Sequence, residues 1–163
     1  MASDRYRSLS PEAIVATLRS LSRRYRAELA NDPSIDLDAV ARGGEGPSPA
    51  AIITTASNGV SALADAIHKA AVLDEPSLTI AAATPGDGGS IDAALAALDA
   101  ATAHAAQVVD DLPTEAWARK ARVSGSGLSG EMTVLELAQE SAREGVERLR
   151  ELTALLDKLK RDR

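Results

Sequence analysis

Residues 132–159 read MTVLELAQESAREGVERLRELTALLDKL, and this stretch decides the fold class because it joins a helix start signal to a sustained helical repeat. Thr133 precedes Glu136 by three residues, the spacing of a capping box in which each side chain bonds the other residue's backbone amide. Apolar side chains then recur every three or four residues, at Leu135, Ala138, Ala142, Val146, Leu149, Leu152 and Leu156. The pattern predicts a long amphipathic helix that buries one face against other helices.

One charged residue, Arg148, falls within that apolar face. A guanidinium beside Leu152 and Leu155 must extend to solvent, pair with a carboxylate or contact a ligand. Glu144 lies one helical turn earlier, so an ion pair within the helix is the simplest interpretation. The alternative is that Arg148 binds an anionic ligand in a cleft between helices.

Three upstream segments show the same helical spacing, and each begins with a helix start signal. The first runs from about Pro11 to Ala30, the second begins near Pro49 and continues to Ala70, and the third follows a Ser90 cap and ends before Pro113. Aliphatic residues form the expected core, since the chain has one Trp, two Tyr and no Phe. Such small side chains favour close packing of helices.

The segments between these helices are rich in glycine, proline and serine, which predicts loops. The predicted loops are residues 31–49, 74–89 and 124–130. Residues 114–117 are expected to form a short helical turn, which would place Trp117 at one end of the helices. No paired strands are expected. The sequence therefore predicts an all-α four-helix bundle with long connections after its first two helices. We expect one domain over residues 1–163, with frayed ends at 1–9 and 160–163.

Composition excludes several classes of function. The net charge of −6 argues against general affinity for nucleic acid, which requires clustered Lys and Arg. No segment approaches about 18 consecutive apolar residues, so we expect no membrane span. The chain has no cysteine, which excludes disulfides, a thiol nucleophile and thiolate metal ligands. The amino-terminal MASDR lacks an apolar signal core, and we expect a cytoplasmic protein.

The order of several motifs carries a family resemblance. LPTEAW at 112–117 is followed by GEMTVLEL at 130–137 and by Arg148-Leu149, and SPAAIITT at 48–55 precedes them. In this order the chain resembles the DinB-like family of helical bundles, which includes mycothiol-dependent enzymes such as maleylpyruvate isomerase. The resemblance spans about residues 11–156 and implies a four-helix bundle. It also implies zinc or nickel bound by three histidines, one from the second helix and an H-x-x-x-H pair from the last.

The chain departs from that pattern at the metal ligands. The three matching positions are Thr55, Glu144 and Arg148, and none is histidine. An arginine keeps its proton and cannot ligate a metal, so we expect the family metal to be absent and predict no cofactor. His104, near the border of the third helix's apolar face, would rebuild a site with Glu144 only if their helices meet there.

These observations favour a metal-less DinB-like protein that binds a small anionic or thiol-type molecule, or a non-catalytic homologue. The predicted ligand cleft lies between the second and last helices, near Thr55, Ser141, Glu144 and Arg148, with His104 as a further candidate. No catalytic residue is identified. Two alternatives stay open: a thiol- or metal-dependent transferase-, isomerase- or hydrolase-like enzyme with a relocated site, and a structural homodimer that pairs alanine-rich faces.

Overall fold

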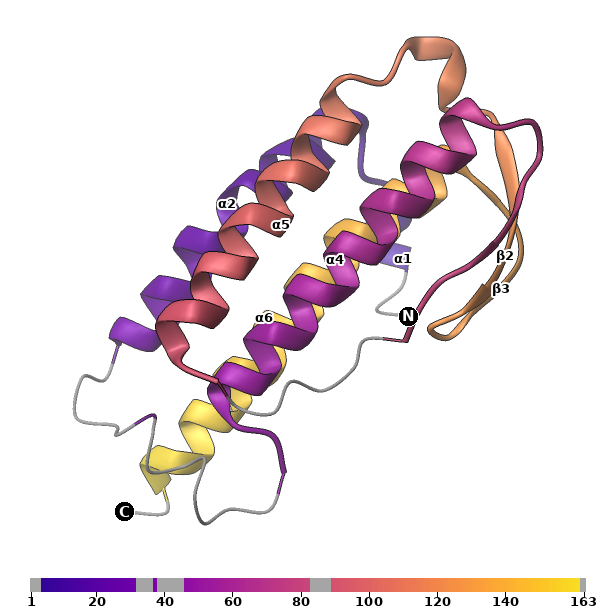
Figure 1. Ribbon diagram of the computed structural model, residues 1–163. Helices are drawn as coiled ribbons and strands as arrows, with labels where there is room; N and C mark the ends of the chain where they lie inside the picture. The colour runs from indigo at the N-terminus through magenta and orange to yellow at the C-terminus, as the bar shows by residue number, and fades with distance from the viewer. Residues whose placement is uncertain (1–3, 32–36, 38–45, 83–88, 162–163) are drawn as a thin grey trace.

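Four long helices lie side by side in the computed structural model, which describes residues 4–31, 37, 46–82 and 89–161 (Figure 1). They are α2 (Pro11–Ala30), α4 (Pro49–Val72), α5 (Ile91–Asp110) and α6 (Val134–Arg161). α4 packs along α5 and α6, and α2 packs along the same two helices. Each helix therefore has two close neighbours around a shared core. Most of the predicted 31–49 connection lies outside the described residues, as do residues 83–88.

The helix starts follow the predicted capping chemistry. The hydroxyl oxygens of Ser10, Ser48 and Ser90 accept hydrogen bonds from backbone amides three residues on, at 3.1–3.2 Å. At the start of α6, the Thr133 amide donates to Glu136 Oε1 and the Glu136 amide donates to Thr133 Oγ1, each at 3.1 Å. The predicted capping box is confirmed. These bonds satisfy amides that have no partner within their own helix.

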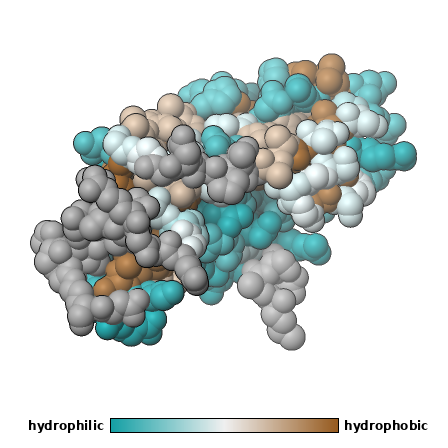
Figure 2. Space-filling view, turned by 60° about the horizontal axis from the view of Figure 1, so that its bottom comes forward, coloured by the Kyte–Doolittle hydropathy of each residue, from teal (hydrophilic) through white to brown (hydrophobic). Residues whose placement is uncertain are grey.

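The core consists mainly of Leu, Ile, Val and Ala side chains, with Tyr25 the largest fully buried residue. α4 supplies many of them, and by length and hydropathy it alone among the described helices resembles a membrane-spanning segment. However, 67% of its apolar window is buried inside the protein, as in a core helix. Figure 2 shows hydrophilic and apolar residues side by side on the described part of one face.

A small sheet corrects the all-α prediction. β1 (Ser77–Thr79), β2 (Lys120–Gly125) and β3 (Leu128–Thr133) lie in that order, with β1 parallel and β3 antiparallel to β2. The segment expected to be a loop at 124–130 is a hairpin, whose turn places Ser126 and Gly127 at φ 53° and 77°. Glycine readily adopts such positive φ values, and these turns suit the twist of paired strands.

The amino-terminal segment is also more ordered than expected from its sequence. Asp4–Arg7 forms a short helix, α1, although residues 1–9 were expected to fray. Tyr6 is buried and its Oη donates to Glu147 Oε1 of α6 at 3.0 Å. Gln139 Nε2 donates to the carbonyl oxygens of Arg7 and Leu9 at 3.0 and 3.1 Å. α1 is therefore fixed against α6.

Candidate functional site

The predicted ion pair in α6 is present. Arg148 Nε donates to Glu144 Oε1 at 2.9 Å, and Arg148 Nη1 donates to Glu151. The side chains of Arg148 and Glu144 are only 29% and 13% exposed, respectively. Burial lowers the pKa of Arg148, but the hydrogen bonds and negative charges of Glu144 and Glu151 outweigh it and raise the pKa overall. Both carboxylates are on α6, so Arg148 is neutralised by its own helix.

Glu144 also fills the space between α4 and α6 where the ligand cleft was predicted. Gly59 of α4 is buried, and a Cβ built there would lie 2.7 Å from Glu144 Oε1 and 2.8 Å from Glu144 Cγ. The absence of a side chain at Gly59 thus provides the room that the Glu144 carboxylate occupies. The structure places the protein's own carboxylate, paired with Arg148, at this position.

The other predicted site residues form bonds within their own helices or face solvent. Thr55 Oγ1 donates to the Ala51 carbonyl oxygen at 2.8 Å, and the buried Ser141 Oγ donates to the Ala138 carbonyl oxygen at 2.6 Å. His104 is exposed on α5, whose close helix neighbours are α2 and α4. Of the five predicted residues, the structure therefore joins Glu144 to Arg148 by direct contact.

The residues at the three positions that match the metal ligands of the DinB-like pattern do not fit a metal. The Thr55 hydroxyl hydrogen is directed at a backbone carbonyl, Arg148 has no lone pair to offer, and Glu144 is committed to Arg148. At most the second oxygen of Glu144 remains, and a single ligand atom does not make a tetrahedral site. Within the described ranges, no three His, Asp or Glu side chains gather in a metal-binding arrangement.

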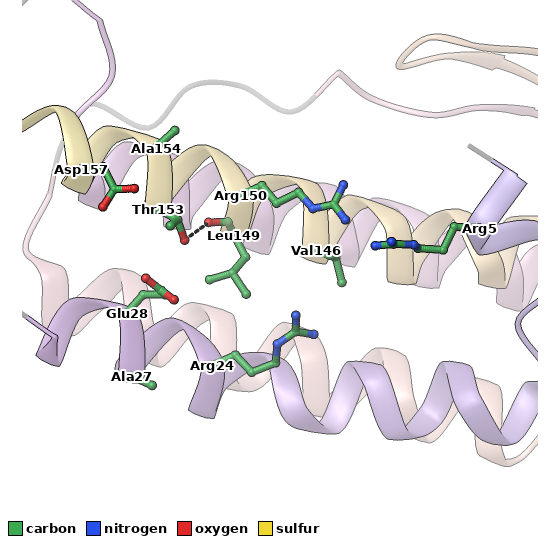
Figure 3. A pocket seen from close by; sticks show the side chains of 10 residues that line it. All are labelled: Arg5, Arg24, Ala27, Glu28, Val146, Leu149, Arg150, Thr153, Ala154 and Asp157. Carbon is green, nitrogen blue, oxygen red and sulfur yellow. Dashed lines mark hydrogen bonds between the residues drawn. The ribbon is translucent and has the colours of Figure 1, made fainter. Parts of the chain in front are cut away.

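A groove lies on a different side of α6, where α6 faces α2 and α1. It has a volume of about 540 Å³, within the range of roughly 300–1,000 Å³ usual for ligand pockets. Three arginines from three elements line it: Arg5 of α1, Arg24 of α2 and Arg150 of α6. Figure 3 shows their side chains around the end of the groove marked by Val146. Cationic groups from separate elements thus share one hollow.

The rest of the groove is apolar along its base and acidic at its far end. Leu149 lies between the helices, and Thr153 follows it, with Oγ1 bonded to the Leu149 carbonyl oxygen at 3.0 Å (Figure 3). Glu28 of α2 and Asp157 of α6 line the end away from the arginines (Figure 3). The groove therefore presents positive charge, an apolar surface and negative charge in succession.

Two of the three arginines have no carboxylate partner in the described part of the chain. Arg150 Nη1 pairs with Glu147 Oε1 at 3.0 Å, which fixes its guanidinium beside α1. Arg5 and Arg24, by contrast, have no carboxylate of a described residue within 4 Å. Their donors are available to an anion in the groove, and an Arg fork suits carboxylate and phosphate groups.

The sequence contains only part of the signal for this groove. Val146, Arg150, Thr153 and Asp157 recur every three or four residues along α6, and Arg24 and Glu28 do so along α2. The spacing places each set on one helix face. That these two faces are neighbours is not visible in the sequence, and neither is the docking of α1.

Comparison with known proteins adds no relative, since no family model, no curated protein and no solved structure matches this chain. The assignment of a function therefore rests on the chain's own residues.

Proposed function

We propose that the chain is a metal-independent protein that binds a small anionic molecule in the groove between α1, α2 and α6. The observation that carries this proposal is the convergence of Arg5, Arg24 and Arg150 on one hollow of suitable volume, in a chain whose net charge is −6. Arg150 is paired with Glu147, whereas Arg5 and Arg24 have no carboxylate of a described residue within 4 Å. An anionic ligand in the groove would supply a partner for these two guanidinium groups.

The groove also suits the size and character of such a ligand. Val146 and Leu149 offer an apolar surface between the helices, while the arginines offer donors that fix the orientation of a carboxylate or phosphate. The ligand we propose is therefore an amphiphilic anion with a short apolar body. Small thiols that carry a carboxylate belong to this class.

The fold is proposed to be that of the DinB-like four-helix bundles, with a three-stranded sheet added beside it. Supporting this are the four long helices, the motif order and the capping box at the start of the last helix. In this proposal the Glu144–Arg148 pair occupies the place of the metal ligands, and binding takes place on another face of α6.

The proposal is tested with octanoate as probe, by thermal shift and isothermal titration calorimetry at low ionic strength. Octanoate should raise the melting temperature, and Arg24→Gln should weaken its binding up to about fivefold, since an exposed ion pair contributes up to about 1 kcal/mol. Arg5→Gln should also weaken octanoate binding. The 3-mercaptopropionate ion serves as the thiol-bearing probe in the same assay.

Arg19→Gln is the matched control, because Arg19 lies on α2 but pairs with Asp110 of α5 at 3.4 Å, away from the groove. It removes the same charge and should leave octanoate binding within twofold of the parent. If Arg19→Gln and Arg24→Gln weakened octanoate binding equally, the effect would come from net charge alone. The groove would then not be the binding site. Weakening by Arg148→Gln alone would instead place the anion in the cleft between α4 and α6.

A further inference from the structure

We infer that the groove selects zwitterionic ligands, in which a cationic amine lies at the end of an apolar chain that begins with the anionic group. The inference rests on the proposed function and extends it to the class of ligand. It follows from the two carboxylates, Glu28 and Asp157, that line the groove at the end opposite the arginines.

The two charged ends belong to one continuous hollow. On α6, Arg150 precedes Asp157 by seven residues, which corresponds to about 10 Å along a helix axis. On α2, Arg24 precedes Glu28 by four residues, or about 6 Å. Both helices therefore present positive charge first and negative charge second in the same direction along the groove, as Figure 3 shows. The separation sets the length of the ligand.

The carboxylates of the acidic end are available for an amine. Neither Glu28 nor Asp157 has a Lys or Arg nitrogen of a described residue within 4 Å, although Arg24 and Glu28 have the i,i+4 spacing that often allows a pair. Figure 3 shows the Arg24 side chain directed toward Val146 and the Glu28 carboxylate directed across the groove toward α6. The two charged groups of α2 thus line different parts of the groove and are not paired with each other.

Between the charged ends, the groove offers no charged side chain and is lined by Leu149 and Thr153 of α6. The hydroxyl hydrogen of Thr153 is bonded to the Leu149 carbonyl oxygen, and the Leu149 side chain forms an apolar middle section. A methylene chain fits this section, because it has no polar group to satisfy there. The groove thus matches a carboxylate, a run of methylenes and an ammonium.

The test compares 8-aminooctanoate with octanoate, two probes that differ only by the terminal amine. Calorimetry on the full chain should show 8-aminooctanoate binding about fivefold more tightly, the amount expected when one exposed ion pair contributes up to about 1 kcal/mol. Asp157→Asn with Glu28→Gln should abolish the difference while leaving octanoate affinity unchanged or slightly improved. Glu12→Gln on the exposed first turn of α2 is the control and should retain the difference.

The outcomes separate this inference from the proposal beneath it. Equal affinities for the two probes in the parent protein would overturn the selection of zwitterions and leave the anion groove in place. A preference for 8-aminooctanoate that survives the double substitution would also overturn it, because the amine would then lie elsewhere. Failure of both probes to bind would overturn the anion groove itself.

Discussion

Tyr25 of α2 donates a 2.6 Å hydrogen bond from its Oη to the backbone carbonyl oxygen of Gly145 in α6. Tyr25 is fully buried, and the absence of a side chain at Gly145 leaves room for Leu21 of α2, since a Cβ at Gly145 would overlap Leu21 Cδ1. The bond and the contact hold α2 against α6 at the inner side of the groove. Arg24 and Arg150 therefore project from helices whose separation is fixed.

Replacing Tyr25 by Phe should lower the free energy of unfolding by about 1 kcal/mol, the usual contribution of a hydrogen bond. The change removes the hydroxyl and retains the ring, so the core stays filled. Urea denaturation followed by circular dichroism measures the difference.

Tyr6→Phe is the companion variant, because the Tyr6 hydroxyl donates to Glu147 from the short helix α1. Loss of this hydrogen bond should release α1 from α6, with a smaller effect on the global unfolding transition.

The same tyrosine predicts a loss of stability at alkaline pH. Burial, followed by the negative charge of Glu144, raises the pKa of Tyr25 in the folded protein well above the value of about 10 in an unfolded chain. Folding therefore favours the protonated phenol. The contribution of this group to the free energy of unfolding is complete below about pH 10 and is lost as the pH rises above that value.

We expect the free energy of unfolding to fall more steeply above pH 10 in the parent protein than in Tyr25→Phe. Urea denaturation at several pH values between 9 and 11.5 gives both slopes. Parallel curves for the two proteins would show that Tyr25 ionises as readily in the fold as outside it.

The two buried helical glycines, Gly145 and Gly59, should respond differently to alanine. At Gly145 the new methyl would overlap the Leu21 side chain, and overpacking of a core costs about 1–3 kcal/mol. At Gly59 the new methyl meets the Glu144 side chain, which lies near the surface and can shift with its partner Arg148, so the cost there should be smaller. The gain in helix propensity of about 1 kcal/mol applies at both positions. Denaturation of both variants should rank Gly145→Ala as the less stable. The reverse order would mean that α2 and α6 lie further apart than described.

The Glu144–Arg148 pair should show a larger coupling energy than an exposed pair. Removing one partner leaves a largely buried charge, whereas removing both does not. A double-mutant cycle with Glu144→Gln and Arg148→Gln is expected to give about 1 kcal/mol, against a few tenths for Arg26 and Asp99, which are 50% and 44% exposed. A coupling no larger than that of the exposed pair would count against a structural role for Arg148.

The helices were predictable because their signals are local. A serine hydroxyl that caps the amide three residues on is encoded within one turn, and α2 begins and ends at the residues expected from the sequence. The ion pair of Glu144 and Arg148 was predictable for the same reason, since i,i+4 spacing places the two side chains together on any helix.

The sheet and the groove depend on contacts between distant segments, which spacing alone does not determine. β2 buries only Ala121 and Val123 and pairs in parallel with Ser77–Thr79, more than 40 residues earlier. Its polar residues and the following glycines resembled a loop, and the alternation at Ala121 and Val123 was the available signal of a strand. Predicting the groove would have required knowing that α6 packs against α2 on one face and against α4 on another.

The docking of α1 has a practical consequence for how this protein is handled. Arg5 reaches the groove because bonds of Tyr6 and Gln139 hold α1 against α6. Proteolytic cleavage after Arg7 would release α1 and remove one wall of the hollow. Ligand screens should therefore use protein whose measured mass shows that Asp4–Arg7 is retained.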